Sequence, residues 1–135
     1  MRFVLAATIW IPAVASAHDV TLIPIRIQDG NNVASASGLM YSILITDGGP
    51  MKLAWDTGAT YSLVQKAVIE TRGLALQDGR YATDTLALGS RDFGPHRMVA
   101  LDLAGAPHVD GVIGANFFAR HRVCFDYGRR AVGVR

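Results

Sequence analysis

Apolar residues at alternate positions predict short β-strands along much of this chain. From Leu22 to Gln28, isoleucines occur at every second position, which is typical of a strand with one buried face. The apolar runs Met40–Thr46 and Met51–Trp55 flank Asp47-Gly48-Gly49-Pro50, a segment of turn-forming residues, and together they predict a hairpin. Further strands are expected at Thr85–Leu88, Met98–Leu103, Val109–Ile113, Val123–Phe125 and Ala131–Val134.

Two short segments have the residue spacing of helices instead. From Ser62 to Arg72 the pattern predicts a helix that Ser62 caps at its start and Gly73 ends. A second short helix is expected at Ala115–Arg120. With so many short strands and only these helices, the predicted fold class is a small, mostly antiparallel β domain with one or two short helices.

The composition fits one compact domain. The chain has 135 residues, half of them hydrophobic and 18% charged, which excludes a disordered or fibrous protein. Thirteen basic residues against eleven acidic ones leave a net charge of +2, too weak a field to indicate nucleic-acid binding. The arginines at 120, 122, 129 and 130 are interpreted as a solvated face, with an anionic membrane surface as the alternative.

The first residues have the pattern of a cleaved signal peptide. Met1-Arg2 is positive, residues 3–14 are almost all apolar, and Ala15-Ser16-Ala17 suits a signal peptidase. A retained anchor helix is the alternative, but the apolar run is shorter than the ~20 residues that span a bilayer. We therefore expect residues 1–17 to be removed, and residues 18–135 to form one exported domain, periplasmic or secreted.

Cysteine and histidine give little reason to expect a metal or a cofactor. The single Cys124 cannot form an internal disulfide, and its place between Val123 and Phe125 predicts a buried, unreactive side chain. Cleavage after residue 17 would leave His18 at the N-terminus, where its amine and ring could chelate copper, so a periplasmic copper-binding protein is an alternative. The other histidines show no ligand spacing.

The candidate chemistry lies where an apolar strand runs into Asp56-Thr57-Gly58-Ala59. The strand would deliver a carboxylate into a turn, where Gly58 lets another backbone approach closely. Some fifty residues later, Val112-Ile113-Gly114 again places two apolar residues and a glycine before a predicted helix. Asp110, just before this segment, is interpreted as a turn residue.

With these two motifs, nearly all of residues 20–135 resembles the retropepsin-like aspartic proteases, specifically their small exported bacterial members. The resemblance implies a small closed β-barrel-like domain that contributes one catalytic aspartate, Asp56, and acts as a homodimer on peptide or protein substrates. It also implies that Thr57 hydrogen-bonds across the dimer, that Gly58 and Ala59 face the substrate, and that Ile113 and Gly114 support the loop of Asp56.

The dimer also follows from chemistry. Hydrolysis of a peptide bond without a metal or a nucleophile needs one group to accept a proton from water and another to donate one. Two facing carboxylates share a proton and so divide these roles; the aspartic proteases are the standard example. One copy of this chain has a single Asp-Thr-Gly and no length for a second lobe. Asp56 would therefore face Asp56 of another copy.

Members of the family cover the cleft with a glycine-tipped hairpin. The corresponding segment is Leu76–Thr85, with Gly79, Arg80 and Tyr81 as the expected tip and as further substrate-binding residues; an ordinary surface turn is the alternative.

The chain departs from the viral members at two linked positions. It has Thr60 and Ala115 where those members carry an acid and an arginine that brace the dimer. This departure favours a second hypothesis, a proteolytically silent module that binds extended peptides or partner proteins. Trp55, bulkier than the usual aliphatic residue before the aspartate, is expected to fill the core.

Overall fold

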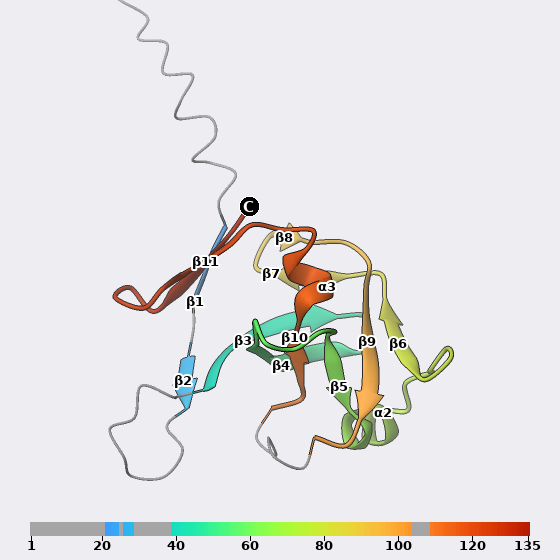
Figure 1. Ribbon diagram of the computed structural model, residues 1–135. Helices are drawn as coiled ribbons and strands as arrows, with labels where there is room; N and C mark the ends of the chain where they lie inside the picture. The colour runs from blue at the N-terminus through green and yellow to red at the C-terminus, as the bar shows by residue number, and fades with distance from the viewer. Residues whose placement is uncertain (1–20, 25, 29–38, 104–108) are drawn as a thin grey trace, which may run out of the picture.

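The computed structural model describes residues 21–24, 26–28, 39–103 and 109–135 (Figure 1). The predicted signal peptide and His18 lie outside these residues. Within the described parts of the chain, no helix is long and apolar enough to cross a membrane.

Two sheets make up the fold. The smaller has the order β1-β12-β11 and is antiparallel throughout; its strands are β1 (Thr21–Pro24), β11 (Val123–Asp126) and β12 (Ala131–Val134). It brings the first described strand against the C-terminal hairpin, to one side of the larger sheet (Figure 1).

The larger sheet carries the candidate site. Its order is β6-β9-β5-β10-β4-β3-β7-β8, and β2 also pairs with β3. Most pairs are antiparallel, but β10 runs parallel to β4 and β5 runs parallel to β9. The strands are β2 (Arg26–Gln28), β3 (Leu39–Thr46), β4 (Gly49–Trp55), β5 (Leu63–Gln65), β6 (Arg80–Thr83), β7 (Leu86–Leu88), β8 (Arg91–Asp92), β9 (His96–Leu101) and β10 (Gly111–Ile113). The sheet curls into a half-barrel, which confirms the predicted small β class.

The core fills the inside of this curled sheet. The predicted hairpin is present as β3 and β4, and Leu44 and Leu53 are fully buried on its inner face. Trp55 is 4% exposed, packs edge-on against Phe117 and donates a hydrogen bond from Nε1 to Ser42 Oγ (2.9 Å). The prediction that Trp55 fills the core is confirmed.

The helices are shorter than the pattern predicted. The expected helix from Ser62 is wrong in its first part: Leu63–Gln65 form β5, and α2 spans Lys66–Arg72. Gly73 ends α2 in a left-handed conformation, as predicted, because glycine adopts a positive φ without a Cβ clash. The second helix, α3, covers Ala115–Phe118 and then passes into a turn.

Cys124 is exposed, so the prediction that it is buried is wrong. Its strand, β11, lies at the edge of the smaller sheet, and side chains alternate between the faces of a strand. Val123 and Phe125 pack against the core, which turns Cys124 outwards.

Candidate functional site

Strand β4 ends at Trp55, and the next residue, Asp56, has an exposed side chain at the start of a tight loop. Asp56 Oδ1 accepts a hydrogen bond from Gly58 N (2.9 Å), and Asp56 O accepts one from Ala59 N (3.2 Å). Asp56 N donates to Ile113 O (3.1 Å). The loop therefore holds the carboxylate by its own backbone and leaves it open to solvent.

Strand β10 supports this loop from below. Ile113 is aligned with Trp55 across the parallel β10–β4 pair, and Ala115 N donates to Ala59 O (2.9 Å). A Cβ on Gly114 would lie 2.6 Å from the carbonyl of Tyr61, so no larger residue fits there. The structure thus brings together Ile113, Gly114 and the Asp56 loop, the residues that the sequence assigned to one another.

Ser62 joins four segments beneath the loop. It is fully buried, and its Oγ accepts a hydrogen bond from Gly114 N (2.9 Å) and donates one to Asn116 Oδ1 (2.7 Å). Asn116 Oδ1 also accepts from Ser62 N (2.8 Å), and Asn116 Nδ2 donates to Arg97 O (2.9 Å). His96 Nε2 lies 2.8 Å from Ser62 Oγ. We call Ser62, His96, Gly114 and Asn116 the serine hub.

The hub also determines the proton position on His96. Asn116 Oδ1 can only accept, so the single hydroxyl proton of Ser62 goes to it. His96 Nε2 must therefore donate to Ser62 Oγ, which makes His96 a neutral imidazole protonated at Nε2. Burial, followed by the nearby charges of Arg120 and His121, lowers the pKa of His96 from 6.5 to about 4.

Asp110 has a structural position at the other end of β10. Its Oδ2 accepts a hydrogen bond from Lys52 N (2.8 Å) and lies 3.8 Å from Arg72 Nη2. Arg72 also donates to the carbonyls of Gly48 (3.0 Å) and Pro50 (2.8 Å). These contacts tie the start of β10 to β4 and α2. They support the interpretation of Asp110 as a turn residue.

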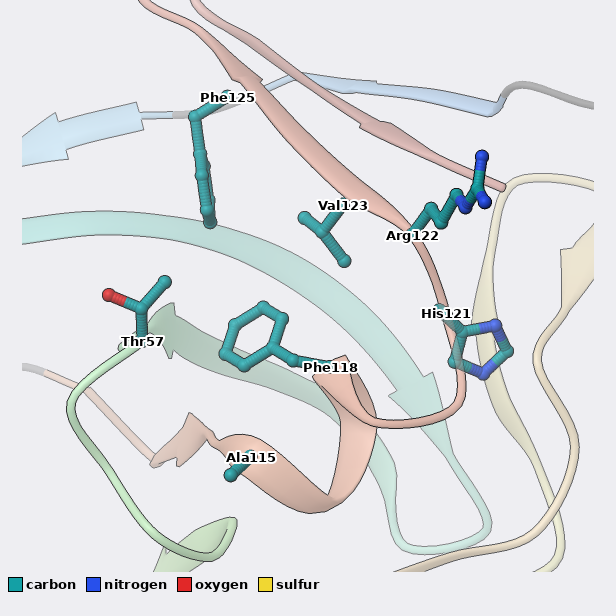
Figure 2. Close-up of a pocket in the computed structure, with 7 residues that line it drawn as sticks. All are labelled: Thr57, Ala115, Phe118, His121, Arg122, Val123 and Phe125. Carbon is teal, nitrogen blue, oxygen red and sulfur yellow. The ribbon is translucent and has the colours of Figure 1, made fainter.

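A hollow of about 560 Å³ opens beside Thr57. Figure 2 shows the Thr57 side chain on one side of it and the Phe118, Val123 and Phe125 side chains on the other. Ala115, His121 and Arg122 complete the lining. Its wall is largely apolar and includes one residue of the Asp56 loop, so a group that docks here would lie next to the carboxylate loop.

The three residues predicted as the hairpin tip do not all lie at the Asp56 loop. Tyr81 is 4% exposed, and its hydroxyl accepts a hydrogen bond from Gly48 N (2.7 Å), in the turn at the opposite end of β4 from Asp56. Gly79 lies in an exposed turn, but its carbonyl accepts from Ala100 N (3.0 Å) and is thereby tied to β9. Only Arg80 of the three reaches the Asp56 loop, through the ring of Tyr61. Alternation along β6 explains the burial of Tyr81.

The site offers acid–base chemistry from one carboxylate. Between Asp56 and Ser62 the loop contains no other ionisable acid or base apart from the Tyr61 phenol. Among the described residues, no three His, Cys, Asp or Glu side chains gather in a way that could hold a metal ion.

A carboxylate loop at the end of a core strand, supported by a second apolar-apolar-glycine strand within a curled sheet, defines the retropepsin-like fold of aspartic proteases. A retropepsin-like aspartic protease from Rickettsia conorii is similar in structure, with a TM-score of 0.57 and 17% identity, over 85% of this chain and 90% of that chain. The retroviral protease-like domain of Ddi1 from Leishmania major is also similar, with a TM-score of 0.56 and 21% identity, over 71% of this chain and 89% of that chain.

No protein-family profile and no curated protein sequence matches this chain. At these identities the structural neighbours establish the fold, which confirms the resemblance that the two motifs indicated.

Sequence reasoning missed the serine hub. Ser62 was expected to cap a helix, and His96 and Asn116 were assigned no role in the site. One signal was present: Ser62 and Asn116 are polar residues within otherwise apolar runs, and a polar residue at a buried position needs a hydrogen-bond partner.

Proposed function

We propose that this protein is an aspartic endopeptidase, active as a homodimer in which Asp56 of each copy contributes to one site. The observation that carries the proposal is the position of Asp56: an exposed carboxylate, held by Gly58 N and anchored through its own N–H to Ile113 O, at the end of a core strand of a retropepsin-like fold.

The chemistry requires both carboxylates. One ionised Asp56 would take a proton from the attacking water, and the other, protonated, would give its proton to the carbonyl oxygen of the scissile bond. The water oxygen bonds to the carbonyl carbon and gives a gem-diol. As the C–N bond breaks, the proton held by the first carboxyl passes to the leaving amine, and one gem-diol hydroxyl returns its proton to the second carboxylate, which restores the starting pair. Two like charges at close range disfavour double ionisation, which maintains the shared proton.

Two observations support a second copy as the source of the other carboxylate. One protomer supplies a single carboxylate to the loop, and that carboxylate is exposed. Beside it, the apolar hollow at Thr57 offers surface that a second copy can bury. An extended peptide between the two copies would pair through its backbone, with side-chain selection by pockets along the strand.

The direct test is Asp56→Asn. It nearly preserves the side-chain volume and removes the titrating group, so we expect loss of peptide hydrolysis with an unchanged circular-dichroism spectrum and unchanged thermal unfolding. Digestion of an unbiased peptide library, read by mass spectrometry at several pH values, measures it. Asp84→Asn, which changes another exposed aspartate, is the matched control. Undiminished cleavage by the Asp56 variant would refute the proposal.

A shared site also predicts that activity depends on concentration. Dilution below the dimer dissociation constant separates the two carboxylates, so specific activity should fall as the enzyme is diluted. Activity strictly proportional to enzyme concentration, down to about 1 nM, would exclude a site shared between dissociating copies, that value being a benchmark for tight binding.

A silent peptide-binding module is the second candidate. It is favoured by the turn at Gly79, which is tied to β9 and does not extend as a free hairpin, and by Thr60 and Ala115, which offer no ion pair to brace a dimer. Binding of peptides by the unmodified protein without any cleavage would support this candidate over the protease.

We further propose that residues 1–17 are a cleaved signal peptide and that the domain works outside the cytoplasm. The alternative for residue 18, an amino-terminal copper ligand, depends on the same cleavage. Expression of the full chain in a bacterial host, with N-terminal sequencing of the periplasmic product, tests it: the product should begin His18-Asp19-Val20. An uncleaved product in the membrane fraction would instead indicate an anchor.

A further inference from the structure

Three arginines lie near Tyr61: Arg80 on β6, Arg97 on β9 and Arg120 after α3. Strands β6 and β9 are neighbours in the larger sheet (Figure 1). The Arg80 guanidinium carbon lies 5.5 Å from the centre of the Tyr61 ring, within cation–π range. Arg97 and Arg120 line a pocket of about 200 Å³ together with Tyr61. We call Arg80, Arg97, Arg120 and Tyr61 the arginine shelf.

This surface has two depressions with one lining residue in common. Arg97 lines both the pocket beside Tyr61 and a smaller one of about 100 Å³, which Arg80 also lines. The pocket beside Tyr61 is further bounded by Pro95, His96 and Asn116. Arg97 therefore lies between the two depressions, with Arg80 lining one and Arg120 lining the other.

The shelf carries an excess of positive charge. All three arginines are exposed, and none of them belongs to the ion pairs of Arg72 with Asp110 or of Arg129 with Asp126. Asp78 is the one acidic residue that lines either depression. Three guanidinium groups against one carboxylate attract anions, and guanidinium binds carboxylate with two parallel hydrogen bonds.

The shelf is connected rigidly to the candidate catalytic loop. Tyr61 belongs to the same loop as Asp56, and its backbone lies directly over Gly114. The backbone of Arg97 is held by Asn116 Nδ2 (2.9 Å), and Asn116 is part of the serine hub beneath that loop. A ligand group seated on the shelf would therefore have a defined position relative to Asp56.

We propose that the arginine shelf binds an acidic side chain of the peptide substrate, at a position removed from the scissile bond. This inference rests on the proposed protease function, which it deepens by naming the substrate class: peptides with Glu or Asp at one position outside the central residues. The shelf acts in binding and leaves the bond-breaking step to Asp56.

The test uses pairs of fluorogenic peptides that differ only by Glu or Gln at a single scanned position. We expect the Glu peptide to be cleaved with about fivefold higher kcat/KM at one position, mainly through KM, as exposed ion pairs of up to about 1 kcal/mol allow. The double variant R97Q/R120Q should lose this preference and cleave the Gln peptide unchanged. R129Q, which removes a distant exposed charge, should keep it.

A second readout does not need catalysis. Fluorescence anisotropy measures binding of the same peptides to the Asp56→Asn variant, with and without R97Q/R120Q, at low and at high salt. Tighter binding of the Glu peptide, lost in the double variant and weakened by salt, supports the shelf.

The outcomes separate the two hypotheses. Cleavage of Glu and Gln peptides at equal rates at every position overturns the shelf and leaves the protease intact. Arginine-dependent binding of Glu peptides without any cleavage by the unmodified protein supports the shelf and refutes the protease. Arginine-dependent binding to vesicles of anionic lipid, with no preference for Glu peptides, overturns the shelf as a peptide site.

Discussion

The buried His96 predicts a specific dependence of stability on pH. The residue is 4% exposed, and its ring donates from Nε2 to Ser62 Oγ. A second proton on Nδ1 would leave that hydrogen bond in place, but it would put a charge into the core next to Arg120, so the folded protein resists protonation. In the unfolded chain the same ring is in water and titrates near its ordinary pKa.

The magnitude follows from the pKa of His96, lowered from 6.5 to about 4. Between these values the unfolded chain holds the extra proton and the folded protein does not, so the free energy of unfolding falls as pH falls. At about 1.4 kcal/mol for each pH unit, His96 destabilises the fold by about 3 kcal/mol on going from pH 7 to pH 4, and by only about 0.4 kcal/mol more below pH 4.

The assay is urea unfolding followed by circular dichroism, at a fixed protein concentration, from pH 7 to pH 4. The perturbation is His96→Gln, because the glutamine amide can donate to Ser62 Oγ and does not titrate. His121→Gln is the control for the second histidine, whose pKa is also lowered, first by burial and then by Arg91 and Arg120.

We expect the loss of stability between pH 7 and pH 4 to be about 3 kcal/mol smaller in His96→Gln than in the unmodified protein. Parallel stability curves for the two proteins over this range would contradict this prediction, because they would show that His96 titrates alike in the folded and unfolded chain.

Four further substitutions test the packing around the site. Ser62→Ala leaves Gly114 N and His96 Nε2 without their partner, so urea unfolding should show a loss of about 2–4 kcal/mol; a loss under about 0.5 kcal/mol would mean that the hub contributes little. Gly111→Ala drives a Cβ into the carbonyl of Leu63 and should cost about 3 kcal/mol or prevent folding, whereas thermal unfolding unchanged from the parent protein would contradict the close approach of β10 and β5. Trp55→Phe keeps a ring in the core but loses the bond to Ser42 Oγ, for an expected loss of about 1 kcal/mol in the same urea assay. Cys124→Ser should change stability by less than about 0.5 kcal/mol, because the thiol is exposed; a cost above about 2 kcal/mol would indicate a buried side chain.

Local features were predictable from the sequence. The hairpin of β3 and β4 depends on a turn segment between two apolar runs, and the end of α2 depends on one glycine. The alternation of side chains along a strand was also readable, but its phase was taken wrongly at Cys124. Tyr81 was expected at a hairpin tip, whereas it lies on the buried face of β6. In both cases the face that the side chain occupies is set by the pairing of its strand.

The start of α2 shows where local pattern loses to tertiary structure. Leu63 suited a helix by its spacing from Ala67 and Glu70, but Leu63–Gln65 pair with β10 on one side and β9 on the other. Hydrogen bonds to two neighbouring strands outweigh a weak helical preference, so β5 forms there.

The amino-acid sequence alone determined the small β class and the carboxylate at the end of an apolar strand, since both follow from residues close together in the chain. The tertiary structure alone decided which distant polar groups meet. Ser62, His96, Gly114 and Asn116 become partners only when β5, β9 and β10 stand side by side in the sheet, and the same arrangement gathers Arg80, Arg97 and Arg120 around Tyr61. Contacts between such separated residues depend on strand order and register, which no single stretch of sequence specifies.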